Sequence, residues 1–281
     1  MPTTTSEFYS EGFLGYGEVG DFKYWSAAHI IPLVLFIAII VLTYIFRDKI
    51  KNLKHENWIR YILAFSMMFN EMSFYWRLLY AGNPDGGNFL NHFPIQVCTI
   101  SSILTVFLLT SENKHIFDYL GFVCLTLGLI PFFTPAVIVR TGPTYYRYYQ
   151  FFFEHMIPVY SVFYFMFVKG YKMSIKNIWK PFVLLVPFGI IAIILNHNIE
   201  GANYFYLGHD TEGASLANIM PDNVYLKAFI YFLVAISLFA IEIGIYYLVI
   251  YLKNKFKKEE IKEDKEIIGN ENYHDNIEEK L

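Results

Sequence analysis

Seven stretches of this sequence are apolar and close to the length that crosses a lipid bilayer, and they restrict the chain to one class of fold. A spanning helix needs roughly 17 to 25 mainly apolar residues. With 55% hydrophobic residues and a mean hydropathy of +0.36, the chain is too apolar for a soluble domain of its length. The sequence therefore predicts an all-α polytopic membrane protein with seven transmembrane helices. The predicted spans are 27–46, 58–80, 94–110, 116–134, 148–168, 179–196 and 224–252.

Lysine and arginine residues gather in connecting segments that alternate along the chain. Most of the 22 fall at 47–60, at Lys114, at 169–180 and after residue 252. Loops rich in these residues stay on the cytoplasmic side of a membrane. We therefore expect a multi-pass protein of the plasma membrane with its N-terminus outside and its C-terminus in the cytoplasm. The expected parts are an extracytoplasmic segment 1–26, a seven-helix transmembrane domain 27–252 and a charged cytoplasmic tail 253–281.

The two cysteines, Cys98 and Cys124, form no CxxC or Cys/His spacing of the kind that binds metals. We expect no disulfide framework, no metal site and no soluble cofactor. The segregation of basic residues concerns topology, so we expect membrane lipids as partners and no nucleic acid. The sequence does not specify an oligomeric state.

Two predicted spans carry a reactive side chain near the same end. Cys98 lies four residues into the third span, and His155 lies seven residues into the fifth. At ~1.5 Å of rise per helical residue, they sit roughly 6 and 10 Å below the outer boundary. Both spans enter from the outer side, so the two side chains lie at comparable depth. Polar groups inside a membrane are costly and tend to mark function.

Cys98 has two interpretations. It shares a narrow polar stripe with Ser101, Ser102 and Thr105, which should face the interior of the helix bundle. In one interpretation the stripe is a seam of small packing residues, and Cys98 is a small hydrophobe within it. In the other, Cys98 is a nucleophile that holds an acyl group as a thioester, which needs an adjacent base.

His155 is the natural candidate for that base, because imidazole can take and return a proton near neutral pH. The alternative is a hydrogen-bonding histidine that fixes helix packing. Arg147, Gln150 and Glu154 share one face of the same predicted helix, with His155 on its shoulder. Arg147 and Gln150 are predicted to bind a phosphate or to stabilise an oxyanion at the membrane surface.

Other polar residues complete the predicted site. Glu71 lies near the middle of the bilayer in the second span and could orient the site from below. His29 lies at the outer start of the first span, and Asn203 and Tyr204 follow the sixth. Because these last three lie at the outer level, we expect them to contact substrate at the mouth of the site. Cys124 is interpreted as a core residue.

Four pieces of the sequence resemble a known family of membrane proteins. Phe93–Ser101 is similar to its L-P-L-H-L-C-S-I-S motif, Arg147–His155 to R-F-F-Q-F-F-x-x-H, and Asn203–Leu207 to N-Y-x-Y-L, with His29 in the first helix. The family is that of the YwaF-type bacterial proteins, grouped with the eukaryotic transmembrane protein 164 acyltransferases. The order and spacing agree from about residue 25 to 252. Gln96 departs from the pattern, which often has a histidine there.

The resemblance implies a function. The eukaryotic members move fatty acyl chains onto lysophospholipids and require a cysteine and a histidine, which correspond to Cys98 and His155. We therefore expect a lipid acyltransferase whose site opens to the outer side of the membrane. An acyl-CoA donor is not expected, because that site lies away from the cytoplasm.

Two other function classes remain open at this point. A non-enzymatic seven-helix receptor or transporter would use the same inward polar residues as a ligand pocket. Transport is less favoured, because we find no inverted repeat and no matching pair of Gly/Pro-broken helices. A membrane scaffold would leave the outer polar cluster unexplained.

Overall fold

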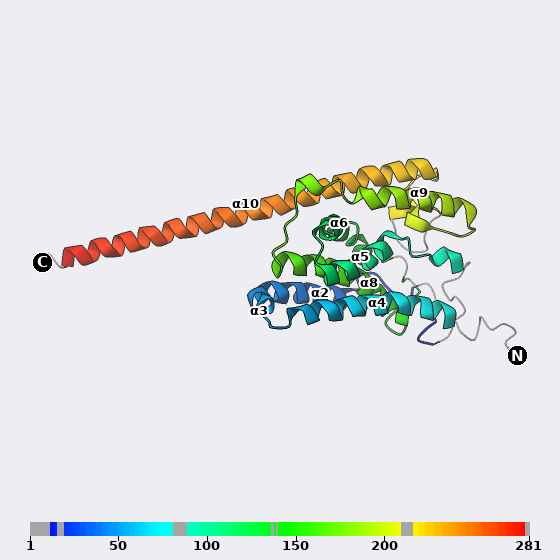
Figure 1. Cartoon of the computed structure of the whole chain (residues 1–281), viewed down its shortest axis with the longest axis horizontal. Coiled ribbons are helices and arrows are strands. Elements are labelled where there is room, and N and C mark those ends of the chain that lie inside the picture. The colour runs from blue at the N-terminus through cyan, green and yellow to red at the C-terminus, as the bar shows by residue number, and fades with distance from the viewer. Residues whose placement is uncertain are drawn as a thin grey trace. The chain divides into compact units, whose positions relative to one another are not determined.

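The computed structural model describes residues 12–15, 20–80, 89–135, 138, 140–208 and 216–278. Parts of the expected N-terminal segment and the end of the expected tail therefore lie outside the described residues. The described residues form helices and turns without a strand, which confirms the all-α prediction. Figure 1 shows the helices.

The helices follow the predicted spans closely. The long ones are α2 (Ala27–Ile45), α4 (Glu56–Tyr80), α5 (Val97–Ser111), α6 (Lys114–Leu125), α8 (Tyr146–Phe167), α9 (Phe182–Asn198) and α10 (Val224–Glu278). The short ones are α3 (Arg47–Lys51), α7 (Ile130–Phe133) and the 3-10 turns η1 (Phe89–His92), η3 (Ile175–Asn177), η4 (Tyr204–Tyr206) and η5 (Leu216–Ile219).

Among the described residues, four helical segments are long and apolar enough to cross a membrane, which supports a membrane protein. They are Ala27–Ile45, Lys114–Phe133, Ile175–Asn198 and Val224–Phe256. The other three predicted spans correspond to α4, α5 and α8. Helix α5 has 15 residues, and α4 and α8 carry buried charged side chains such as Arg77 and Glu154. The seven-span topology and its orientation stay predictions.

The fourth predicted span, 116–134, is not one continuous helix. Helix α6 ends at Leu125, a turn follows, and α7 begins at Ile130. Pro131 can open a helix but cannot continue one, because it lacks an N–H and its ring clashes with the preceding turn. Gly128 permits the break, since a Cβ there would lie 2.7 Å from the Cys124 carbonyl oxygen. The predicted span matches the apolar segment Lys114–Phe133, which is long enough to cross a membrane, but its helix is interrupted by this turn.

Helix α8 is the centre of the packing. It contacts α2, α4, α5, α6 and α7 (Figure 1), and most of its side chains are buried. Helix α2, by contrast, buries only His29, Phe36 and Thr43, which are spaced seven residues apart on one face. Most of its other side chains are exposed, as expected of a helix that lies against lipid.

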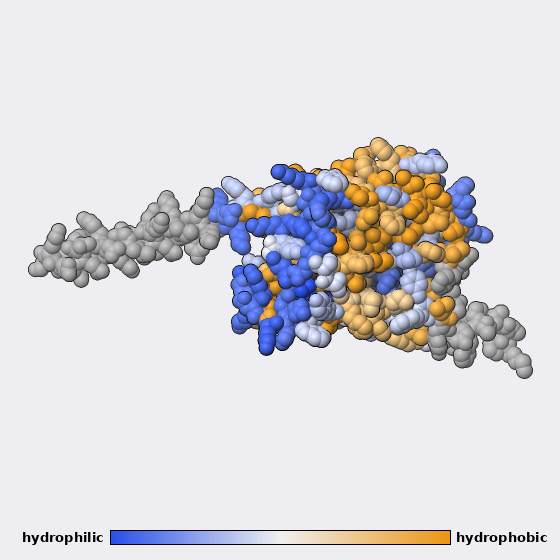
Figure 2. Space-filling model, viewed as in Figure 1, coloured by the Kyte–Doolittle hydropathy of each residue, from blue (hydrophilic) through white to orange (hydrophobic). Residues whose placement is uncertain are grey.

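Helix α9 is the least packed of the long helices. Ala192 is its one buried residue, while Val183, Ile190 and Ile194 are each 55% exposed. Figure 2 shows hydrophobic residues gathered over α9 and the beginning of α10, and hydrophilic residues gathered around α3. A contiguous apolar surface of this kind indicates contact with lipid.

The chain divides into two compact units, Met1–Phe239 and Ala240–Leu281. The first contains every helix up to α9, the beginning of α10 and all residues of the candidate site. The second consists, in its described part, of the remainder of α10, which carries the last predicted span on into the charged tail.

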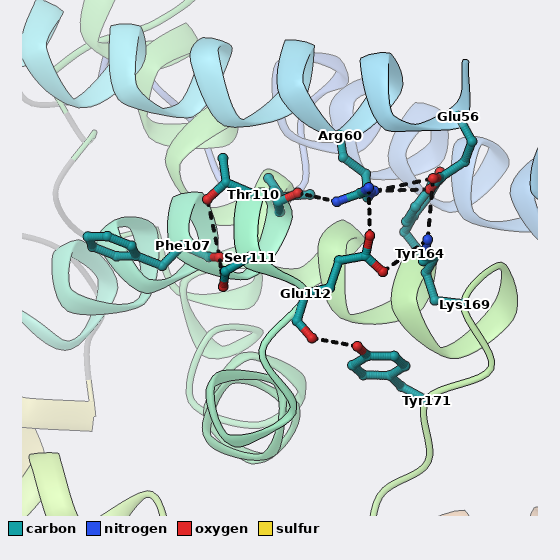
Figure 3. A network of polar contacts seen from close by, with 10 residues as sticks. Glu56, Arg60, Phe107, Thr110, Ser111, Glu112, Tyr164, Lys169 and Tyr171 are labelled. Carbon is teal, nitrogen blue, oxygen red and sulfur yellow. Dashed lines mark hydrogen bonds and ion pairs between the residues drawn. The ribbon is translucent and has the colours of Figure 1, made fainter. Parts of the chain in front are cut away.

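A cluster of charged residues joins α4, α5 and α8, and we call it the clamp (Figure 3). Arg60 pairs with Glu56 at 3.1 Å and with Glu112 at 2.7 Å. Lys169 lies 3.3 Å from Glu56 and 3.0 Å from Glu112, and the Tyr164 hydroxyl donates to Glu56 at 2.6 Å. Each carboxylate thus has two cationic partners.

The partners of Glu56 in the clamp set its charge state. Glu56 precedes the second predicted span. Burial acts to raise its pKa, but the hydrogen bond from Tyr164 and the charges of Arg60 and Lys169 outweigh burial and hold the pKa below the ordinary value of 4.5. The clamp therefore keeps Glu56 ionised at neutral pH.

Candidate functional site

A single large cavity collects most of the predicted site residues. Its volume is about 1400 Å³, which exceeds the ~300–1,000 Å³ of drug-sized pockets. Its walls come from α4, α5, α6, α8, α9, η4 and the first part of α10. The lining includes Cys98, His155, Arg147, Gln150 and Asn203, and also Glu71.

One wall of the cavity is a row of polar side chains on α8. Residues three, four and seven positions apart share a helix face, which places Arg147, Gln150 and Glu154 in line. Arg147 Nη1 donates to the Gln150 side-chain oxygen and lies 3.4 Å from Glu154 Oε2. Gln150 Nε2 donates to the same Glu154 oxygen at 3.0 Å. The three side chains therefore hold one another in a fixed row.

The row is also fixed from outside its own helix. The Arg147 guanidinium lies over the Phe74 ring of α4, 4.8 Å from its centroid, in a cation–π contact. Asn70 of α4 donates to the Gln150 backbone oxygen at 3.3 Å. Helix α4 thus sets the position of α8 at the level of the cavity.

Cys98 occupies the first turn of α5 and faces the cavity. Ser101, Ser102 and Thr105 of its stripe are buried, so that stripe does point inward. Glu154 lines the same cavity as Cys98, and its charge acts on the Cys98 thiol. Cys98 is a free thiol, and the base that a thiol nucleophile needs could come from His155, which lines the same cavity.

His155 lies on the same wall and is oriented by its own helix. Its Nδ1 lies 2.7 Å from the Phe151 carbonyl oxygen, and its ring is 4.5 Å from the Phe151 ring. A carbonyl oxygen only accepts, so Nδ1 carries the proton. In the neutral ring Nε2 is then the atom that can accept one. The Phe151 backbone is thus what orients this histidine, which the sequence did not indicate.

Glu71 is the second acidic residue of the cavity, and one of its two carboxyl oxygens has no hydrogen-bond partner within the described residues. That oxygen, Oε2, is buried. Tyr75, one turn further along α4, also lines the cavity and donates to the His92 carbonyl oxygen at 3.2 Å. Unpaired buried carboxyl oxygens are costly and are concentrated at functional sites.

Asn203 and Tyr204 divide between two roles. Asn203 lines the cavity, whereas Tyr204 is fully buried and does not. The Tyr204 hydroxyl donates to the Leu90 carbonyl oxygen and accepts from the Phe93 N–H at 2.9 Å. Its backbone pairs with the Asn196 side chain of α9. The structure therefore places Tyr204 as the anchor of the η4 segment.

Gln96 acts as a second anchor of that segment. Its Nε2 donates to the Asn203 carbonyl oxygen at 3.0 Å, and its Oε1 accepts from the Phe205 N–H at 2.8 Å. Only a side chain with both a donor and an acceptor can make this pair of bonds. Gln96 is two residues before Cys98, so these bonds fix the cavity wall next to the thiol.

His29 is not brought to the cavity. Its ring is fully buried, Nδ1 accepts from the Trp25 N–H at 3.1 Å, and Nε2 donates to the Phe132 carbonyl oxygen at 2.6 Å. Both ring nitrogens are therefore engaged in joining the start of α2 to α7. This position gives His29 a packing contact where the sequence suggested a substrate contact.

Two residues that the sequence did not single out as site residues belong to the cavity. Glu154 was placed on the right face of α8, but its contact with Cys98 depends on how α5 packs against α8. Cys124, interpreted as core, lines the cavity although its side chain is buried. Among the described residues no group of three His, Cys, Asp or Glu side chains is arranged to bind a metal.

Comparison with known proteins agrees with the resemblance seen in the sequence. The model of the TMEM164 family matches residues 24–258. The chain therefore belongs to the TMEM164 family. It matches no curated protein and no solved structure.

Proposed function

We propose that this member of the TMEM164 family transfers acyl chains between membrane lipids, through a thioester on Cys98 and with His155 as the base. The observation that carries the proposal is the shared cavity: a thiol, an imidazole and a row of polar and charged side chains line a space of about 1400 Å³ to which α9 and α10 contribute mainly apolar side chains. Phospholipids have the same division into a polar headgroup and apolar chains. In the predicted orientation the site opens toward the outer leaflet.

The first half of the reaction loads the enzyme. The Cys98 thiol gives its proton to Nε2 of His155, and its sulfur attacks the ester carbonyl carbon of a phospholipid. The bond between that carbon and the glycerol oxygen breaks, and the oxygen takes the proton back from His155. The products are the Cys98 thioester and a lysophospholipid.

The second half reverses these steps with a different lipid. The hydroxyl of an acceptor lysophospholipid gives its proton to His155, and its oxygen attacks the thioester carbonyl carbon. The carbon–sulfur bond breaks, and the Cys98 sulfur takes the proton. No cofactor is consumed, because one ester is exchanged for another.

Arg147, Gln150 and Glu154 organise this chemistry. Glu154 lines the cavity with Cys98, and its carboxylate, next to His155 in the chain, stabilises the imidazolium that forms when the ring takes a proton. Arg147 and Gln150 hold Glu154 in place. Arg147 also supplies positive charge for a lipid phosphate or for the oxyanion of the tetrahedral intermediate.

The test uses the two cysteines of the cavity as a matched pair. Purified protein in lipid vesicles is given isotope-labelled phosphatidylcholine and an unlabelled lysophospholipid, and transfer of the labelled chain is followed by mass spectrometry. We expect Cys98→Ala to abolish transfer and Cys124→Ala to retain it. Normal transfer by the Cys98→Ala protein would refute the mechanism.

A trapped intermediate separates an enzyme from a receptor. We expect a thiol-directed lipid probe to label Cys98 in the unmodified protein, and labelling to fall in a His155→Gln variant. Saturable lipid binding without an adduct and without transfer would instead favour a receptor or transporter.

A further inference from the structure

The lining of the cavity is divided by polarity. Glu71 of α4 and Arg147 and Glu154 of α8 make one side charged. The apolar side comes from α6, the turn after it, α9 and α10. Its members include Val123, Leu127, Phe182, Leu185, Ile190 and Phe232. Cys98 lies on α5, whose packing against α8 places it at the charged side. An acyl chain attached to its sulfur must therefore extend along the apolar side.

The part of the apolar side that comes from α9 has one position without a side chain, Gly189. Leu185, Val186, Ile190 and Ile193 line the cavity with large side chains, and Gly189 lies between them. A Cβ added at Gly189 would meet no atom within 4 Å. A glycine within a helix costs roughly 0.5–1 kcal/mol relative to alanine. Gly189 therefore does not serve the stability of α9, and what it provides is space.

The hydrogen bonds at the end of α9 show how deep Gly189 lies relative to Cys98. Asn196 of α9 is bonded to Tyr204, and the adjacent Asn203 is bonded to Gln96, so these residues lie at one level. Gly189 is seven residues before Asn196, or about 10 Å along the helix axis, whereas Cys98 is two residues after Gln96, or about 3 Å into its helix. An acyl chain that extends from Cys98 toward Phe182 passes Gly189 before it ends.

We propose that Gly189 sets the longest acyl chain that the cavity accepts, by leaving open the part of the α9 wall that a long chain occupies. This inference rests on the proposed function for the identity of the occupant, a fatty acyl chain. A larger side chain at Gly189 projects into the cavity between Cys98 and Phe182 and shortens the space that is left for the acyl chain.

The experiment compares Gly189→Leu with Gly244→Leu. Gly244 is a suitable control because it also lies within a helix, its added Cβ also meets no atom within 4 Å, and it does not line the cavity. Both substitutions improve helix propensity by a similar amount. Each protein is purified from the same membranes, and the chains of its bound lipids are measured by mass spectrometry. Transfer is then measured with donors of increasing chain length.

We expect Gly189→Leu to shift bound and transferred chains toward shorter lengths, and Gly244→Leu to leave both unchanged. Each methylene excluded from an apolar site lowers affinity roughly fourfold. Gly189→Ala should shift the distribution less than Gly189→Leu, and it covers the case in which the leucine variant does not fold.

The inference is overturned if Gly189→Ala and Gly189→Leu bind the same chain lengths as the unmodified protein, or if the purified protein carries no acyl lipid. The bound-lipid measurement does not depend on turnover. A chain-length shift in bound lipid without any transfer would therefore uphold the role of Gly189 and refute the acyltransferase.

Discussion

Clusters of charged side chains lie at both ends of α8. They contain similar residues but differ in how completely their carboxylates are paired. At the end of the helix, the clamp pairs Glu56 and Glu112 each with two cations. At the beginning of the helix, Arg147 forms an ion pair with Glu154, while one carboxyl oxygen of Glu71 has no hydrogen-bond partner within the described residues. Both clusters join α8 to α4. The comparison teaches that buried charge by itself does not mark a reactive site.

What separates the clusters is the space beside them. None of the residues of the clamp lines the cavity. The cluster at the beginning of α8 faces about 1400 Å³ of open volume with a thiol on its border. If the comparison is correct, substitutions in the clamp change stability, and substitutions at the cavity change chemistry. Four experiments can break or sharpen it.

The largest effect is expected from His155→Gln. Removing a general base lowers a rate by about 10²–10⁴-fold, and we expect acyl transfer to fall within that range. The glutamine amide can still donate to the Phe151 carbonyl oxygen, so the midpoint of thermal unfolding in detergent should hardly change. A variant with lost transfer and an equally lowered midpoint would make His155 a packing residue.

The next largest effect is expected from Arg60→Leu in the clamp. The Arg60 side chain is 5% exposed and forms ion pairs with two carboxylates. Removing one partner of a buried ion pair costs about 3–5 kcal/mol. We expect the free energy of unfolding to fall toward the lower end, because Glu112 is partly exposed. Transfer per folded molecule should be retained. Transfer lost at full stability would contradict the division between clamp and cavity.

A pH effect follows from Glu56. Its pKa is lower in the folded protein than the ordinary value of 4.5, so it contributes stability that is fully present above that pH. The contribution is lost as pH falls through the lower, folded pKa. We expect the thermal midpoint of the unmodified protein to fall as the pH drops below about 4.5 and through the lower, folded pKa. Glu56→Gln should be less stable at neutral pH and show a smaller decline, and an identical decline in both would contradict the assignment.

The smallest effect is expected from Glu71→Gln at the cavity. Because Glu71 Oε2 has no partner in the described residues, replacing the carboxyl should change the free energy of unfolding by no more than about 1 kcal/mol. The matched change in the clamp, Glu112→Gln, should destabilise more. Equal losses at the two positions would mean that the clusters do not differ as described.

Much of the fold could be predicted from the sequence. Apolar runs of nearly bilayer length placed the starts of the helices within a few residues, since the polar backbone must be satisfied within the helix wherever water is excluded. The break in the fourth span was missed, although Gly128 and Pro131 stand in the sequence. A hydropathy pattern counts apolar residues and does not register the backbone space that Gly128 provides.

The candidate site was predictable in part. Helix periodicity on α8 correctly grouped Arg147, Gln150 and Glu154, because residues on one helix face are fixed by the 3.6-residue turn. The roles of His29 and Tyr204 could not be obtained in this way. Their partners, the Phe132 and Leu90 carbonyl oxygens, lie more than 100 residues away in the chain.

The sequence by itself determined that this chain is helical and apolar, that it belongs among membrane proteins, and which side chains share a helix face. These properties depend on local composition and period. Only the tertiary structure decided which faces meet: that Cys98 approaches Glu154, that His155 is oriented by Phe151, and that Gly189 leaves a gap in the α9 wall. Cavities and contacts between helices depend on packing between residues distant in the chain, and local pattern does not encode their geometry.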